Sequence, residues 1–60
     1  MNTTYQLYED ETKHDRTFIP KDHPQKEMLI NGKPLIWEIE AENFEEACEK
    51  RDQYLQMRAV

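Results

Sequence analysis

The sequence predicts an α+β fold in which one C-terminal helix packs on one face of a small antiparallel sheet of three or four strands. Three observations lead to this prediction. Residues 3–8 alternate between the two faces of an extended chain, Asn31-Gly32 separates two apolar runs, and residues 43–57 carry apolar side chains at helical spacing. With 60 residues, the chain is expected to form one domain over 1–60, and a domain of this size buries only about 60% of its unfolded surface.

The first strand is predicted at residues 3–8. Tyr5 and Leu7 fall on one face and Tyr8 falls on the other, and a period of two with aromatic and β-branched residues is typical of a half-buried strand. The charged, aperiodic residues 9–16 predict a loop. A short second strand is expected at 17–19, ended by Pro20, and a proline-containing connector follows to Gln25.

A β-hairpin is predicted over residues 27–40. Asn-Gly between apolar runs is the strongest short hairpin signal, because both central residues of a type I′ turn need positive φ. In the expected register Met28 faces Leu35, and Leu35, Trp37 and Ile39 share the core face. Pro34, which has no N–H, is expected at a non-hydrogen-bonded position, so that the strand is an edge there.

The last element is a helix predicted at 43–57. Asn43 is a good N-cap, and Glu46 three residues later completes a pattern like a capping box. We expect an (i, i+4) ion pair between Glu46 and Lys50, and Arg58 suits the negative end of the helix dipole. Tyr54 flanks the predicted inward stripe, which consists of Phe44, Ala47, Cys48, Arg51, Leu55 and Ala59.

The negative charge of the chain is concentrated in one segment. The formal net charge is −5, yet residues 1–37 hold six acidic and five basic residues, whereas 38–52 hold seven acidic and two basic. Glu45 and Glu49 are like charges four residues apart on a helix, which is slightly destabilising. An ordinary solvated helix face explains this pattern in structural terms. A surface reserved for a basic partner explains it in functional terms, because complementary charge speeds encounter and selects partners.

The predicted partner-binding surface combines these acids with an apolar patch. Tyr8 and Ile36 are expected to be exposed on the uncovered side of the sheet, while Trp37 belongs to the core. The full set of predicted partner-binding residues is Glu38, Glu40, Glu42, Glu45, Glu49, Asp52, Tyr8 and Ile36.

The sequence favours no catalytic, metal or cofactor site. His14 and His23 lie nine residues apart in loops, which does not match the local ligand spacings of zinc sites. Cys48, the single cysteine, falls on the inward stripe, where Cys behaves as a small hydrophobic residue. Gly32 is the only glycine, so no glycine-rich phosphate loop is present. We therefore predict no enzyme activity and no cofactor.

These observations predict a small, cytoplasmic, non-enzymatic protein that docks on a larger protein and modulates or inhibits it, as a phage or host inhibitor would. In the sharper version, the acidic helix imitates nucleic acid and occupies a basic nucleic-acid-binding groove. Direct nucleic-acid binding is not expected at a pI near 4.9, nor is membrane association, because the longest apolar run is three residues. An accessory structural subunit of a larger complex is the alternative, and a homodimer formed through a sheet edge stays open.

Overall fold

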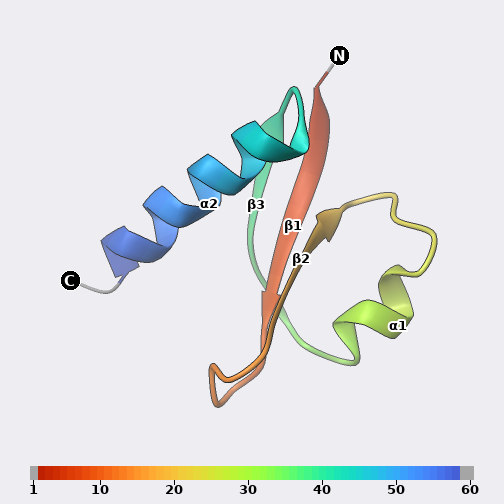
Figure 1. Cartoon of the computed structure of the whole chain (residues 1–60). Helices are drawn as coiled ribbons and strands as arrows, with labels where there is room; N and C mark the ends of the chain where they lie inside the picture. Colours follow the sequence, from red (N-terminus) through yellow and green to blue (C-terminus); the bar gives the residue numbers. More distant parts are fainter. Residues whose placement is uncertain (1, 59–60) are drawn as a thin grey trace.

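The computed structural model describes residues 2–58, which form an α+β fold around a three-stranded antiparallel sheet. The sheet order is β2-β1-β3, so that β1 is central. Two helices lie on opposite sides of this sheet, α2 on one side and α1 on the other (Figure 1). The elements are β1 (Thr3–Glu9), β2 (Arg16–Pro20), α1 (Lys26–Ile30), β3 (Leu35–Ala41) and α2 (Phe44–Arg58).

The β1–β2 hairpin is longer than expected. Glu9 and Arg16, which we assigned to the connecting loop, are the last and first residues of the two strands and lie opposite each other. The loop is shortened to residues 10–15, where Asp10 and Asp15 are joined by a backbone hydrogen bond of 3.1 Å. The pairing extends this far because Glu9 and Arg16 form an ion pair across the ladder.

The predicted hairpin at Asn31-Gly32 is wrong. Met28 and its neighbours belong to the short helix α1, so the chain also has a second helix in addition to the one predicted. Asn31 (φ 47°) and Gly32 (φ 79°) do adopt positive φ, but they do so as the end of a helix, which needs the same left-handed conformation as a type I′ turn. The Asn31 N–H donates to the Glu27 carbonyl at 3.3 Å, which closes the last helical turn.

Lys33 holds α1 against β2. Its side chain is 7% exposed, and its ammonium group lies 3.3–3.4 Å from the last carbonyl oxygens of α1, those of Leu29 and Ile30. The same ammonium pairs with Asp15 at 3.0 Å, and the Thr17 hydroxyl of β2 donates to the Leu29 carbonyl at 3.0 Å. These contacts satisfy the free carbonyls of the helix end, and they explain in physical terms why residues 28–30 form a helix here.

The predicted helix at 43–57 is confirmed as α2. The side-chain oxygen of Asn43 accepts the Glu46 N–H at 2.8 Å and its carbonyl accepts the Ala47 N–H at 3.1 Å, so Asn43 is the N-cap. The reciprocal half of a capping box is not present, because the Glu46 carboxylate pairs with Lys50 at 3.2 Å, the predicted (i, i+4) pair.

Aromatic side chains join α2 to the sheet. Tyr54 stacks on Trp37 with ring centroids 4.9 Å apart, and Phe44 lies 5.9 Å from both Tyr5 and Phe18. Ala47 is fully buried in the same cluster. The inward stripe therefore includes Tyr54, which we placed at its flank, whereas Phe44 is half exposed and Ala59 lies outside the described residues.

The guanidinium of Arg51 packs against the aromatic cluster. Its carbon lies 5.1 Å from the Phe18 ring centroid, and a guanidinium at this distance from an aromatic face makes a cation–π contact. Arg51 thus closes the aromatic cluster from the side of β2.

The second face of the sheet is also covered, which corrects the expected exposure of Tyr8. This side chain is 5% exposed, and the Lys26 ammonium of α1 lies 5.9 Å from its ring centroid.

A β-bulge in β3 corrects the face on which Leu35 was predicted. The register passes from Leu7–Trp37 to Tyr8–Leu35, which leaves Ile36 as the extra residue and moves Leu35 away from the face of Trp37 and Ile39.

Two leucines on the sheet test this description of the core. Leu7 is 1% exposed at the centre of the sheet, whereas Leu35 is 47% exposed. Leu7→Ala should lower the free energy of unfolding by about 2–5 kcal/mol, a large part of the roughly 3–9 kcal/mol expected for a domain of this length. Leu35→Ala, the matched control, should cost less than about 1 kcal/mol. Urea unfolding followed by Trp37 fluorescence measures both, and equal losses would contradict the assignment.

Candidate protein-binding surface

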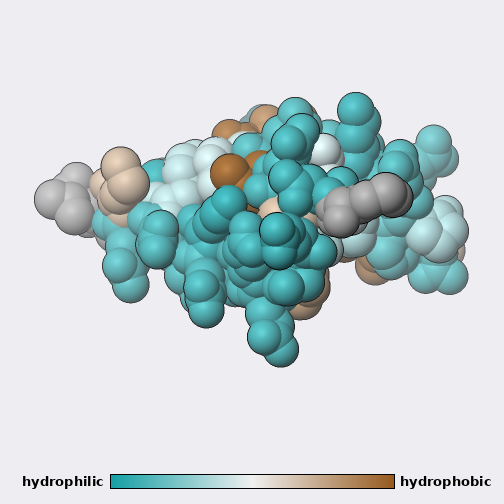
Figure 2. Space-filling model, turned by 90° about the horizontal axis from the view of Figure 1, so that it is seen from above, coloured by the Kyte–Doolittle hydropathy of each residue, from teal (hydrophilic) through white to brown (hydrophobic). Residues whose placement is uncertain are grey.

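The acidic residues of segment 38–52 are largely on the surface. All of them are exposed except Glu46, which is half-buried. Figure 2 looks down on the molecule from the top of Figure 1, and hydrophilic side chains cover most of this view. Among residues 2–58, no ion pair or side-chain hydrogen bond engages the carboxylates of Glu40, Glu42, Glu45 and Glu49.

The two basic residues of the same segment are already engaged. Lys50 pairs with Glu46 and lies 3.4 Å from the Glu40 carbonyl oxygen. Arg51 pairs with Asp52 at 3.1 Å while it contacts Phe18. The four carboxylates therefore have no ion-pair partner in the described part of the chain, which leaves a locally negative surface.

The structure divides the predicted acidic surface between two sides of the molecule. Trp37 and Ile39 point toward α2, so Glu38 and Glu40, which alternate with them, point to the opposite face of the sheet. The helical positions of Glu45, Glu49 and Asp52 lie opposite those of Ala47 and Tyr54, which face the sheet. Glu42 lies in the connection between β3 and α2.

A chain of polar contacts holds Glu38 in place. The Tyr8 hydroxyl donates to the Gln6 side-chain oxygen at 2.6 Å, and the Gln6 amide donates to the Glu38 carboxylate at 3.0 Å. Gln6 and Tyr8 are both buried, and a buried polar group that lacks a partner is costly. Tyr8 therefore supports one of the predicted acidic residues from beneath. Tyr8 is too buried to contact a partner itself, and Ile36, which was also predicted to be exposed, is half-buried.

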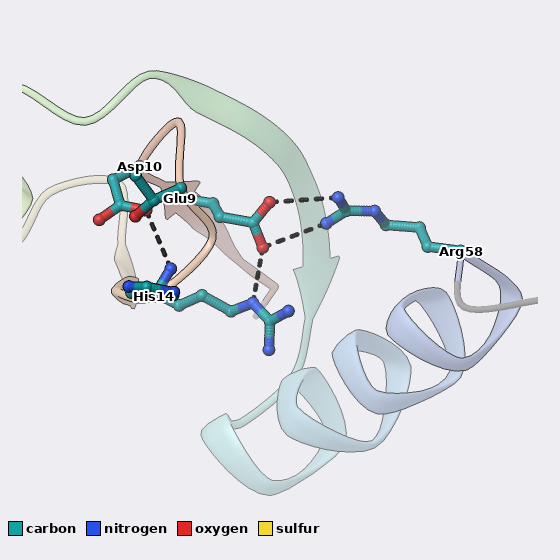
Figure 3. A network of polar contacts seen from close by, with 6 residues as sticks. Glu9, Asp10, His14 and Arg58 are labelled. Atoms are coloured by element: carbon teal, nitrogen blue, oxygen red, sulfur yellow. Dashed lines mark hydrogen bonds and ion pairs between the residues drawn. The ribbon is translucent and has the colours of Figure 1, made fainter.

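Sequence reasoning missed the most strongly engaged carboxylate, that of Glu9. Its side chain is 4% exposed, and Figure 3 shows it directed toward Arg58 at the end of α2. The Arg16 side chain of β2 pairs with the same carboxylate. The contact distances are 3.1 Å to Arg58 and 2.6 Å to Arg16. The alternation that places Tyr5 and Leu7 on the core face also places Glu9 there, and this was the signal in the sequence that could have identified it.

These contacts shift ionisation as expected for a buried carboxylate with two cations. Hydrogen bonds from Arg58 and then from Arg16 lower the pKa of Glu9, and they outweigh the opposing effect of burial. The hydrogen bond to Glu9 in turn raises the pKa of Arg58. Arg58 thus forms an ion pair with Glu9 of β1, in addition to lying at the negative end of the helix dipole.

The Asp10 carboxylate is held within the turn that follows β1. Burial alone would raise its pKa, but hydrogen bonds from the Thr12 hydroxyl and from backbone N–H groups, that of His14 among them, lower it (Figure 3). Of the two carboxyl groups with a lowered pKa, Glu9 therefore joins the hairpin to α2, and Asp10 holds the turn of the hairpin. Neither is one of the residues predicted to bind a partner.

The histidines and the cysteine occupy separate surroundings. His14 is exposed in the β1–β2 loop, the His23 ring accepts the Gln25 N–H at 3.0 Å, and Cys48 is half-buried on α2. Within residues 2–58 no group of three or more His, Cys, Asp or Glu side chains is arranged to hold a metal ion. Neither helix in that range has the length and apolar character needed to cross a bilayer.

The fold and the surface define a small α+β protein with an acidic end, where β3 runs into α2 (Figure 1). Comparisons with known protein families, with curated proteins and with solved structures found no match to this chain.

Acidification should destabilise the fold partly through Glu9. Its folded pKa lies below the ordinary value of 4.5, so the unfolded chain takes up this proton at a higher pH than the folded chain does. The stabilisation is complete above about pH 4.5 and is lost as the pH falls through the lower folded pKa. We expect Glu9→Gln to be less stable than the parent at pH 7 and to lose less stability between pH 5 and 3.

The measurement is the urea midpoint at each pH, with Glu11→Gln as the control. Glu11 is exposed in the neighbouring turn, so this variant should keep the parental pH dependence. If the curves of Glu9→Gln and the parent stay parallel throughout acidification, Glu9 is not the group responsible.

Proposed function

We propose that this chain is a small, non-enzymatic, cytoplasmic protein that docks on a basic surface of a larger protein and modulates or inhibits it. The observation that carries the proposal is the set of exposed carboxylates at Glu40, Glu42, Glu45 and Glu49, whose neighbouring bases Lys50 and Arg51 are engaged elsewhere. Unpaired surface charge of one sign attracts a partner of the opposite sign and speeds its association.

The placement of the acids supports a groove as the partner surface. Glu38 and Glu40 lie on the side of the sheet away from α2, whereas Glu45 and Glu49 lie on the outer side of α2. A flat basic surface would reach only one of these sets at a time, but a groove that takes in the end of the molecule would contact both. Nucleic-acid-binding grooves are basic because they neutralise phosphates, so a groove of this kind is the partner that the proposal favours.

Charge reversal tests the proposal on the partner that co-purifies with the tagged chain from its own cells. Glu38→Lys with Glu40→Lys, and separately Glu45→Lys with Glu49→Lys, should each weaken binding by about tenfold or more at low salt. Affinity of the parent should fall steeply as salt rises, because exposed charges are screened. Competition by DNA or RNA for the partner would identify the groove as a nucleic-acid-binding one.

The matched control is Glu11→Lys with Asp22→Lys, which makes the same change in net charge at two exposed residues outside segment 38–52. This variant should retain most of the affinity. If it weakens binding as much as the other two, or if none of the three does, docking through the acidic end is refuted.

The alternative of an accessory structural subunit is favoured by a different feature, the exposed apolar side chains. Met28 and Met57 are 75% and 78% exposed, and Leu35 and Phe44 are about half exposed. Burial of such side chains in a complex would make binding insensitive to salt. A salt-independent affinity, unaffected by the charge reversals, would therefore support this alternative.

A further inference from the structure

The outer edge of β3 has the features of a strand-pairing site. In the described part of the chain β3 is an edge strand, because β1 is its one strand neighbour there. Pro34 and the bulge at Ile36 interrupt regular pairing only at its beginning, and the ladder with β1 is regular from Trp37 to Ala41. Natural edge strands are usually protected by prolines, bulges or lysines along their length.

The backbone groups that face outward belong to Glu38 and Glu40. The Thr4 carbonyl accepts the Lys21 N–H at 2.8 Å, so Thr4 directs its hydrogen-bonding groups away from β3. Its partner in the register, Glu40, must then direct its own N–H and C=O away from β1, and so must Glu38 two residues earlier. The contact of Lys50 with the Glu40 carbonyl agrees with this direction.

The edge therefore presents two kinds of group at the same residues. The outward N–H groups of Glu38 and Glu40 have no backbone partner among residues 2–58, and both carboxylates are exposed on the side of the sheet away from α2. Within the described residues, the one side-chain hydrogen bond to the backbone of this edge comes from Lys50, at a distance of 3.4 Å that marks a weak bond. A strand that paired here would place its own side chains directly opposite two glutamates.

This charge pattern disfavours a second copy of the chain as the occupant. In an antiparallel ladder, a residue whose backbone N–H and C=O point toward the partner strand lies opposite a residue whose own N–H and C=O point back toward it. Two copies joined through β3 would therefore set Glu38 and Glu40 of one against the same glutamates of the other, and like charges directly opposite each other are destabilising. The complementary occupant is a strand with Lys or Arg at alternate positions.

We propose that β3 binds an extended basic segment of the partner as a fourth, antiparallel strand, with Lys or Arg at alternate residues opposite Glu38 and Glu40. This inference rests on the proposed function and specifies how the docking occurs. Main-chain hydrogen bonds would supply affinity, and the two carboxylates would select the sequence. The polar chain from Tyr8 through Gln6 holds Glu38 in position before the partner binds.

The test uses three synthetic peptides with capped ends. The first, Thr-Lys-Val-Lys-Val-Lys-Thr, alternates lysine with valine. The second, Lys-Val-Thr-Lys-Thr-Val-Lys, has the same composition but no two lysines at alternate positions, and the third is the first with methyl groups on the backbone nitrogens of its lysines. Methylation keeps every charge and removes the N–H groups that would pair with β3.

The alternating peptide should bind at least about tenfold more tightly than either control, because the second peptide cannot place lysines opposite both Glu38 and Glu40 and the methylated peptide lacks the N–H groups that would pair with β3. At saturation it should also slow hydrogen exchange at the Glu38 and Glu40 amides by about tenfold or more. Equal binding of the methylated or the second peptide, or no binding of the alternating one, would overturn the proposal. So would dimerisation of the chain with the same two amides protected.

A pair of variants tests the same edge from the side of the protein. Glu40→Pro removes the outward N–H without removing a hydrogen bond to β1, and Glu40→Gln removes the charge alone. After circular dichroism has established that both are folded, Glu40→Pro should weaken the alternating peptide several-fold more than Glu40→Gln does. Equal effects of the two variants would mean that charge alone attracts the peptide.

Failure of this inference is distinguishable from failure of the proposed function. If charge reversal abolishes binding of the cellular partner but the methylated peptide binds as well as the alternating one, acidic docking stands and strand addition is refuted. If charge reversal leaves the cellular partner bound, the proposed function itself is refuted whatever the peptides do.

Discussion

The constraint on which the rest of the structure depends is that the central strand is buried on both faces. Five consecutive residues of β1, from Tyr5 to Glu9, are buried. A strand of this kind needs cover on each side, so α2 packs on the face of Tyr5 and Leu7, and α1 lies on the face of Tyr8. In a chain of 60 residues, the sheet and the two helices that cover it use most of the sequence. The acidic residues of segment 38–52 remain on the outside of this fold.

Burial on both faces also requires partners for the polar residues of β1. Gln6 is satisfied by Tyr8 and Glu38, and Glu9 is satisfied by Arg16 and Arg58. Among the described residues no buried side-chain polar atom lacks a partner. The Glu9 contacts join β1, β2 and the last turn of α2, so one carboxylate connects both ends of the sequence. The charges that hold the fold are therefore separate from the charges proposed to bind a partner.

The proposed docking and strand addition both use the end of the molecule at which this packing stops. Among residues 2–58, β3 has a strand neighbour on one side only, and α2 begins shortly after it. The acids concentrated in this short segment therefore border both a free sheet edge and an outer helix face. Lys50, which lies between them, pairs with Glu46 and contacts the Glu40 carbonyl, and it is the one side chain that partly protects the edge in the described part of the chain.

The sequence by itself determined the elements whose signals are local. The strand at residues 3–8, the Asn43 cap and the Glu46–Lys50 pair depend on neighbours within a few positions, and the structure contains all three. Only the tertiary structure decided the fate of Asn31-Gly32, because positive φ suits a hairpin turn and a helix end equally well. Distant contacts of Lys33 with Asp15 and Thr17 favour the helix. It likewise decided that Tyr8 is covered, that Glu9 is paired and that the acids divide between two sides, since each depends on residues that meet only when the sheet and both helices are assembled.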